Sequence, residues 1–109
     1  MKFSRLLGLV IIMLAASYPL NAENLSPANE WITLGTMGGP IPNPTHSQPA
    51  NALVVGDNVY LVDVGDGAAG RLVAAGESLK SVRAVFVSHL HFDHTAGLPA
   101  VIALRWQTN

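Results

Sequence analysis

The sequence contains no cysteine, which excludes disulfide bonds and thiolate metal ligands anywhere in the chain. Any metal ion must therefore be held by nitrogen and oxygen atoms. Charged residues are scarce, at 12% of the 109 residues, while 50% are hydrophobic. This length suits one small domain and is too short for two.

No apolar run reaches the roughly 20 residues that a membrane-spanning helix needs. The run from Leu6 to Ala16 has 11 residues, follows Lys2 and Arg5, and precedes the small residue Ala22. A positive start, a short apolar core and a small residue at the end are typical of a secretory signal peptide. We expect residues 1–22 to be a signal peptide that directs export to the periplasm or the medium, without a stable membrane span.

The expected mature part, residues 23–109, lacks an excess of positive charge. It has four basic and seven acidic residues, a net charge of −3. Surfaces that bind nucleic acid carry clustered lysine and arginine. The composition and the expected export therefore argue against nucleic acid as a partner and favour a small molecule.

Short apolar runs separated by turn residues predict an α/β chain. Glycine, aspartate and asparagine at 56–58 predict a β-hairpin, and strand–helix–strand order over 59–88 predicts two parallel strands joined by a crossover. We expect Thr95 to cap a last helix with Pro99 in its first turn. The expected strands are 31–34, 52–55, 59–62 and 84–88, and the expected crossover helix is 68–75, stopped by Gly76.

A loop rich in glycine and proline, residues 35–51, separates the first two expected strands. A loop of this length in a compact domain is usually functional or disordered. His46 stands alone in it, and we interpret this histidine as a loop residue rather than a ligand.

The segment "SHLHFDHTAGLP", residues 88–99, contains three of the four histidines. These histidines follow one expected strand, and Asp63 follows the neighbouring one, so these residues would meet at the carboxyl ends of the two strands, where ligands bind in α/β sheets. His89 and His91 are two residues apart and can point to the same side of an extended loop. Asp93 and His94 follow as a second pair. Imidazole and carboxylate ligands suit zinc, with manganese or iron as substitutes, so the two pairs predict a two-metal site.

Three segments resemble one family. His89-x-His91-x-Asp93-His94 is similar to the metal-binding motif of the metallo-β-lactamase-fold hydrolases. "ITLGTMGGPIPNP" and "YLVDVGDG" resemble the opening loop and the aspartate-bearing strand of the ribonuclease Z and arylsulfatase-like branch. Met37 departs from that branch, which usually has glycine there. The resemblance implies the N-terminal half of a four-layer αββα sandwich, incomplete at the C-terminus, over residues 23–109.

The resemblance also implies roles for the motif residues. His89 and His91 would bind the first of two zinc ions, and Asp93 and His94 would bind the second. Asp93 would in addition act in catalysis. Asp63 would orient the motif loop through hydrogen bonds. The remaining ligands of the family come from later in its chains, which leaves two ligands per metal ion here.

The expected function is hydrolysis of a small anionic ester, an aryl sulfate or a phosphodiester, by metal-activated water. Export favours this substrate class. One alternative is a ribonuclease Z-type nuclease that processes the 3′ end of tRNA, because the branches share these motifs. Two further alternatives are a half-domain that is catalytically inert as it stands and a di-iron redox protein of the same fold.

Overall fold

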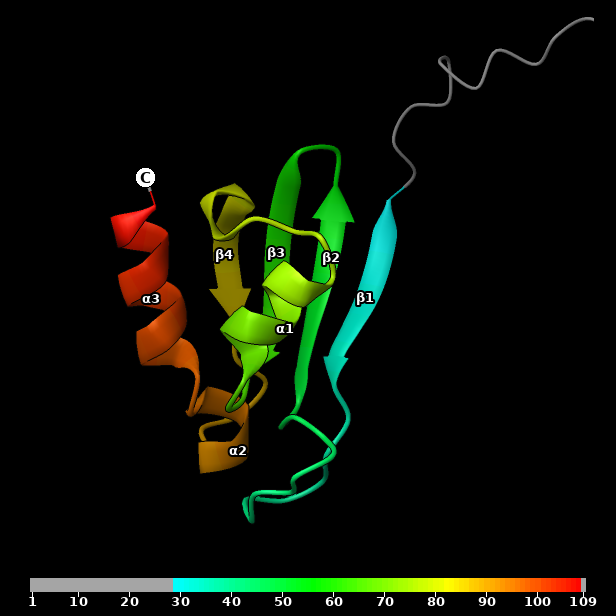
Figure 1. Cartoon of the computed structure of the whole chain (residues 1–109), viewed down its shortest axis with the longest axis vertical. Helices are drawn as coiled ribbons and strands as arrows, with labels where there is room; N and C mark the ends of the chain where they lie inside the picture. The colour runs from blue at the N-terminus through cyan, green and yellow to red at the C-terminus, as the bar shows by residue number, and fades with distance from the viewer. Residues whose placement is uncertain (1–28, 109) are drawn as a thin grey trace, which may run out of the picture.

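The structure is a computed structural model that describes residues 29–108, so the expected signal peptide lies outside the described residues. A four-stranded sheet carries its helices on one face (Figure 1). The elements are β1 (Glu30–Gly35), β2 (Ala50–Val55), β3 (Asn58–Val64), α1 (Ala68–Ala74), the 3-10 turn η2 (Leu79–Ser81), β4 (Val82–Phe86), α2 (Phe92–Thr95) and α3 (Leu98–Gln107).

The strands are ordered β1-β2-β3-β4. The β1–β2 and β2–β3 pairs are antiparallel, and β4 is parallel to β3. The predicted hairpin is confirmed: Gly56 and Asp57 form the turn, and Gly56 has a φ of 56°. The predicted crossover through α1 is also confirmed, and Gly76 follows that helix with a φ of 91°. This order brings the carboxyl ends of β3 and β4 to the same edge of the sheet.

The core lies between the sheet and the helices. One cross-strand row of side chains, one from each strand, faces α1 and α3: Ile32, Ala52, Leu61 and Val85. Leu72 of α1 and Val101 of α3 pack against this sheet face and are 0% and 2% exposed. Burial of these apolar side chains holds the helices on the sheet.

The other face of the sheet is apolar and open within residues 29–108. Trp31, Leu53, Tyr60 and Ala84 are paired in a row across the four strands, and Phe86 pairs with Val62 beside them. Trp31 is 55% exposed and Phe86 is 57% exposed. Large exposed apolar patches of this kind usually mark contact surfaces.

We predict that the chain on its own self-associates through this open face, because association removes the apolar side chains from water. Replacing Trp31 and Phe86 together with threonine should shift the chain toward monomer in sedimentation velocity. The control is Trp106→Thr, which removes an equally large side chain, 79% exposed, from α3. A wild-type chain that sediments as a monomer at high concentration would contradict the prediction.

The strand boundaries differ from the sequence prediction by at most two residues, and two differences lie beside the motif loop. The last strand runs over Val82–Phe86, earlier than the expected 84–88, and Gly97 rather than Thr95 is the N-cap of α3. Thr95 lies inside the short helix α2, where its hydroxyl donates to the His91 carbonyl 3.2 Å away. Since that helix already occupies residues 92–95, α3 can start only after Gly97, and Pro99 lies in its first turn as predicted.

In residues 29–108, no helix has the length and apolar character needed to cross a membrane.

Candidate functional site

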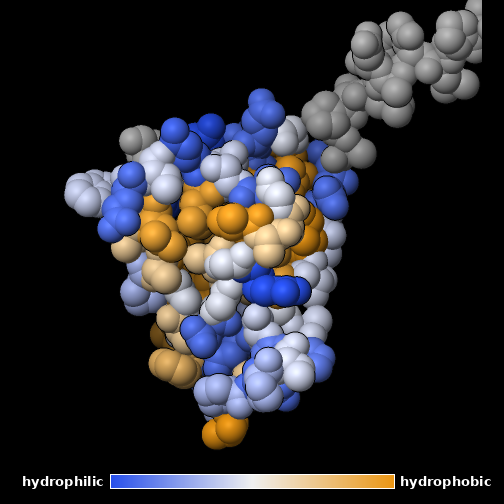
Figure 2. All heavy atoms as spheres, viewed as in Figure 1, coloured by the Kyte–Doolittle hydropathy of each residue, from blue (hydrophilic) through white to orange (hydrophobic). Residues whose placement is uncertain are grey.

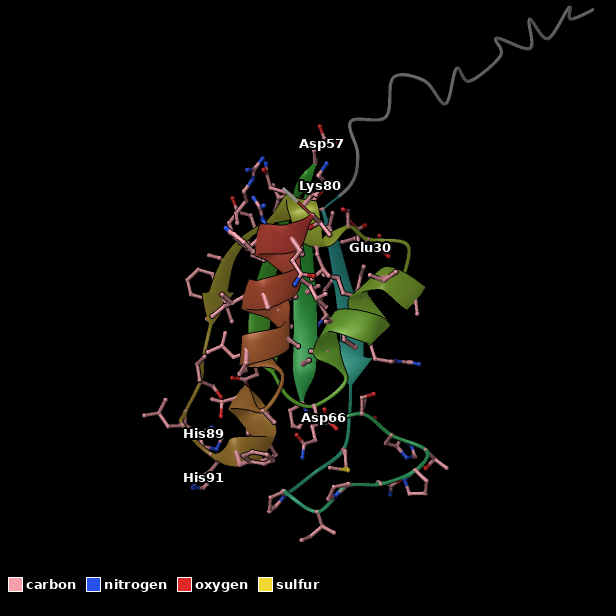
Figure 3. The ribbon with its side chains drawn as sticks, turned by 60° about the vertical axis from the view of Figure 1, so that its left-hand side comes forward. Glu30, Asp57, Asp66, Lys80, His89 and His91 are labelled. Atoms are coloured by element: carbon pink, nitrogen blue, oxygen red, sulfur yellow. The ribbon has the colours of Figure 1, made fainter. Side chains whose placement is uncertain are left out.

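The predicted site residues lie together beyond the carboxyl ends of β3 and β4. Asp63 belongs to the end of β3, and residues 88–94 form the loop and helix that follow β4. Figure 3 shows His89 and His91 at this end of the molecule, with Asp66 between them and the loop that follows β1. The fold therefore gathers the candidate residues at one edge of the sheet.

Asp63 is the extra residue of a β-bulge. Ala50 of β2 pairs with Val64 and Asn51 pairs with Val62, so Asp63 has no partner on β2. Its φ is 58°, in the left-handed region where aspartate and asparagine are the most common residues after glycine. Bulges near functional sites redirect side chains. Here the bulge turns the carboxylate of Asp63 toward the motif loop.

The Asp63 carboxylate accepts three hydrogen bonds from this loop. The backbone N–H of Ser88 donates to Oδ1 at 2.7 Å, and its hydroxyl donates to Oδ2 at 2.8 Å. Nδ1 of His94 also donates to Oδ2, at 2.8 Å. Asp63 is 7% exposed, so these bonds are shielded from water and fix both ends of the motif loop on β3.

The pKa of the Asp63 carboxyl is lower than its ordinary value. Burial by itself raises this pKa, because it disfavours the charged form. The hydrogen bonds from Ser88 and His94, together with the charge that His94 can carry, lower the pKa by more. A carboxylate at this position keeps the proton of His94 on Nδ1 and leaves Nε2 of that ring with a lone pair.

His89 and His91 present two ring nitrogens to each other. Nε2 of His89 lies 3.1 Å from Nδ1 of His91, and Nδ1 of His89 lies 3.1 Å from the Ser88 hydroxyl oxygen. Because that hydroxyl donates to Asp63, Nδ1 of His89 is the donor to Ser88, and Nε2 carries the lone pair. The two nitrogens can share one hydrogen bond or bind one cation.

Asp93 and His94 form the second pair. Oδ2 of Asp93 lies 3.6 Å from Nε2 of His94, and Asp93 is 5% exposed. The rings of His94 and His89 are in contact, with centroids 4.0 Å apart. The two pairs are therefore neighbours in one cluster, although they come from opposite ends of the motif loop.

The spacing within each pair fits a metal ion. A tetrahedral zinc ion with Zn–N bonds of 2.0–2.1 Å places its ligand atoms roughly 3.3 Å apart. The observed separations are 3.1 Å between His89 and His91 and 3.6 Å between Asp93 and His94. In residues 29–108, however, no group of three or more histidine, aspartate or glutamate side chains is arranged to hold one ion. Since a catalytic zinc ion usually has three protein ligands, each pair needs at least one ligand from elsewhere.

Glycines allow the motif loop to pack directly on β3. The backbone N–H of Gly97 donates to the Val64 carbonyl at 2.8 Å. A Cβ atom at Gly97 would collide with the Gly65 carbonyl, and one at Gly65 would collide with the Asp93 carbonyl. The glycines thus set the distance between the strand and the motif.

No feature of the sequence points to Gln48, the buried residue that connects the loop after β1 to the segment after β3. It is 3% exposed, and its side-chain oxygen accepts from the Asp66 backbone N–H at 2.8 Å. Its side-chain amide donates to the Pro40 carbonyl at 3.2 Å. A glutamine in a loop without periodicity looks like a solvent-exposed residue until the fold is known. His46 lies in this loop and lines a cavity beside Asp66, apart from the motif histidines.

Comparison with known proteins identifies related chains. The model of the metallo-beta-lactamase superfamily matches residues 44–108. Ribonuclease Z of Mycobacterium marinum is 41% identical over 78 residues, which are 72% of this chain and 28% of that protein. Ribonuclease Z of Mycobacterium bovis is 40% identical over the same shares of the two chains.

Solved structures of proteins with this fold also match the chain. The short form of human tRNase Z matches with a TM-score of 0.67 at 29% identity, over 72% of this chain and 30% of that one. The metallo-beta-lactamase fold protein YhfI of Bacillus subtilis matches with a TM-score of 0.64 at 24% identity, over 72% of this chain and 32% of that one, which shows the fold alone. This chain thus spans less than a third of the length of these relatives and has part of their fold, as the sequence predicts.

Proposed function

Because the chain belongs to the metallo-beta-lactamase superfamily, we propose that it carries the first ligands of a zinc-dependent phosphodiester hydrolase of the ribonuclease Z type. The observation that carries the proposal is the pair of ring nitrogens, on His89 and His91, that lie 3.1 Å apart beside the Asp93–His94 pair. The relatives matched by sequence are ribonucleases Z, which supports an RNA phosphodiester as the substrate.

The roles of the residues follow from their contacts. His89 and His91 would hold one ion, and Asp93 and His94 would hold a second. Asp63 keeps the proton of His94 on Nδ1, which directs Nε2 of that ring toward the ligand position. Zinc bound there would lower the pKa of water toward neutrality and polarise the substrate oxygen; manganese or iron suit the same ligands.

One observation favours a second candidate, an exported hydrolase of small aryl sulfates or phosphodiesters. The positively charged start and the apolar run of residues 6–16 are typical of a signal peptide. The similarity to ribonucleases Z supports the tRNA-processing hypothesis more than the small-ester hypothesis. We therefore propose hydrolysis of small esters only as the second candidate function.

Export is tested by mass spectrometry of the protein made in its native cell type. We predict a mature N-terminus near Glu23 in the periplasmic or secreted fraction, because a signal peptidase prefers a small residue such as Ala22 before the cut. A cytoplasmic product that still begins with Met1 would contradict export and remove the main support for the small-ester substrate.

The substrate is tested with the longest natural protein that contains this chain, loaded with zinc and supplied with precursor tRNA, an aryl sulfate and an aryl phosphodiester. Cleavage of precursor tRNA at its 3′ side is the expected result. Hydrolysis of the small esters without any cleavage of RNA would refute the ribonuclease assignment. Failure on all three, with zinc bound, would refute hydrolysis as the function.

A further inference from the structure

A cavity of about 340 Å³ lies between the loop after β1 and the start of α1. This volume is at the lower end of the range of small-molecule sites, which begins at about 300 Å³. Polar side chains line most of it, and the neighbouring end of the helix-covered face is largely hydrophilic (Figure 2). The residues that carry the argument are Asn43, Thr45, His46, Asp66 and Arg71. We call this the loop cavity.

The loop cavity is connected to the motif loop through Gly65 and Asp66. The backbone of Gly65 packs directly against Asp93, and its N–H donates to the Pro49 carbonyl at 3.0 Å. The next residue, Asp66, lines the cavity. The cavity therefore adjoins the segment after β3 on which the motif loop packs.

The walls of the loop cavity are held in place by hydrogen bonds within the chain. Gln48 bonds to Pro40 on one side and to Asp66 on the other, and the N–H of Met37 donates to the Ser47 carbonyl at 3.0 Å. Gln48 and Met37 are 3% and 8% exposed. A preformed wall lowers the entropy cost of binding.

Arg71 supplies a positive charge to the cavity. Its Nε donates to the Leu34 carbonyl at 3.3 Å, and it takes part in no ion pair within residues 29–108. The Nη donors of the guanidinium are thus available to an anion. The other lysine and arginine residues of the described range contact or adjoin the start of β4, at the opposite end of the sheet, as Figure 3 shows for Lys80.

The cavity also contains acceptors. The Asp66 carboxylate lines it, and within the described residues it makes no ion pair. The Thr45 backbone N–H and hydroxyl both donate to Oδ1 of Asn43, at 2.8 and 2.7 Å. The Thr45 hydroxyl, whose hydrogen is thereby used, accepts from Nδ1 of His46 at 2.7 Å. The neutral His46 ring consequently has its lone pair on Nε2.

We infer that the loop cavity binds one nucleotide of the substrate, with its phosphate on the Arg71 guanidinium and its sugar hydroxyls donating to Asp66 and His46. A bare oxyanion would use Arg71 but would be repelled by the carboxylate of Asp66. A nucleotide offers both an anion and hydroxyl donors, which matches the mixed lining. The inference rests on the proposed function for its RNA substrate, but the binding itself needs no metal ion.

The test is equilibrium dialysis of adenosine 5′-monophosphate against the full chain in the presence of EDTA, which works whatever the oligomeric state. We expect measurable binding by the wild type and a loss of roughly ten-fold or more in Arg71→Gln, since a hydrogen bond to a charged group is removed. Arg71→Lys, which keeps the charge but not the planar fork, should fall between them. The matched control is Arg83→Gln on β4, which should leave binding unchanged.

Asp66→Asn distinguishes a nucleotide from a simple anion. It should weaken binding of adenosine 5′-monophosphate, because the hydroxyl acceptor loses its charge, and it should strengthen binding of inorganic phosphate or 4-nitrophenyl sulfate. Tighter binding of adenosine 5′-monophosphate by Asp66→Asn would overturn the nucleotide assignment. Equal affinities in wild-type and folded Arg71→Gln protein, or no binding by the folded wild type, would overturn the site itself.

These outcomes separate the inference from the proposed function. A chain that binds adenosine 5′-monophosphate through Arg71, in a protein that cleaves no RNA, would refute the ribonuclease assignment and leave the site intact. A protein that cleaves precursor tRNA equally well with and without Arg71 would refute the site alone.

Discussion

Replacing Asp93 with alanine is expected to lower kcat by about a thousand-fold in the active protein, with a smaller effect on the ion held by His89 and His91. Asp93 is 5% exposed, and its Oδ2 lies 3.6 Å from Nε2 of His94, so we assign it to the proposed second pair. Loss of one ligand of a two-metal site removes transition-state stabilisation of several kcal/mol, while the first pair keeps both of its ring nitrogens.

The measurement is kcat and KM on precursor tRNA together with the zinc content per chain. The control is Asp57→Ala, which removes a carboxylate from the β2–β3 turn at the far end of the sheet (Figure 3) and should leave kcat, KM and the zinc content unchanged. Turnover close to that of the wild type in Asp93→Ala, with the fold intact, would refute the assigned role of Asp93.

Two substitutions at Asp63 should separate its backbone role from its electrostatic role. Asp63→Asn keeps a residue that tolerates the φ of 58°, and its side-chain oxygen can still accept from the Ser88 N–H. It loses the charge that holds the proton on Nδ1 of His94. We expect a loss of 10–100-fold in metal affinity, the usual effect of removing a hydrogen-bond partner of a ligand, with a smaller loss of stability.

Asp63→Ala should lose stability as well as metal affinity. Alanine in the left-handed region costs about 1–2 kcal/mol. The unpaired Ser88 and His94 donors add roughly 1–3 kcal/mol, so the free energy of unfolding should fall by about 2–5 kcal/mol. Urea unfolding in EDTA measures this change. Equal stabilities of Asp63→Ala and Asp63→Asn would contradict the strained backbone, and unchanged metal affinity in both would contradict the role of the carboxylate.

The lowered pKa of Asp63 gives a further signature in the same experiment. Because the pKa is lower in the folded state than in the unfolded state, the carboxylate stabilises the fold above the unfolded pKa. That stabilisation disappears as the pH falls through the folded pKa. The free energy of unfolding of Asp63→Asn should therefore depend less on pH in the acidic range than that of the wild type.

The parts of the fold that can be predicted from the sequence are those that depend on neighbouring residues in the chain. The Gly56–Asp57 turn fixes the β2–β3 hairpin, and the apolar runs on either side of α1 require a parallel crossover. The placement of Asp63 opposite the motif loop follows from that crossover, since the ends of β3 and β4 must meet.

The features that the sequence does not predict depend on contacts between distant segments. The bulge at Asp63 exists because β2 pairs with residues 62 and 64, and nothing in the local sequence specifies that register. The buried position of Gln48 depends on Pro40 and Asp66, which are 8 and 18 residues away. The N-cap at Gly97 depends on the hydrogen bond from its N–H to the carbonyl of Val64 on β3.

Long-range ¹H–¹⁵N NMR of the histidine rings during a zinc titration of the full chain tests the central claim most directly, because the chain has four histidines and the proposed site would use three. Before zinc, the neutral rings of His89 and His94 should show the proton on Nδ1. Zinc should then shift the resonances of Nε2 of His89 and His94 and of Nδ1 of His91, while His46 serves as the internal control. Zinc that shifts all four histidines equally, or none of the three in the motif, would contradict the metal site on which the proposed function depends.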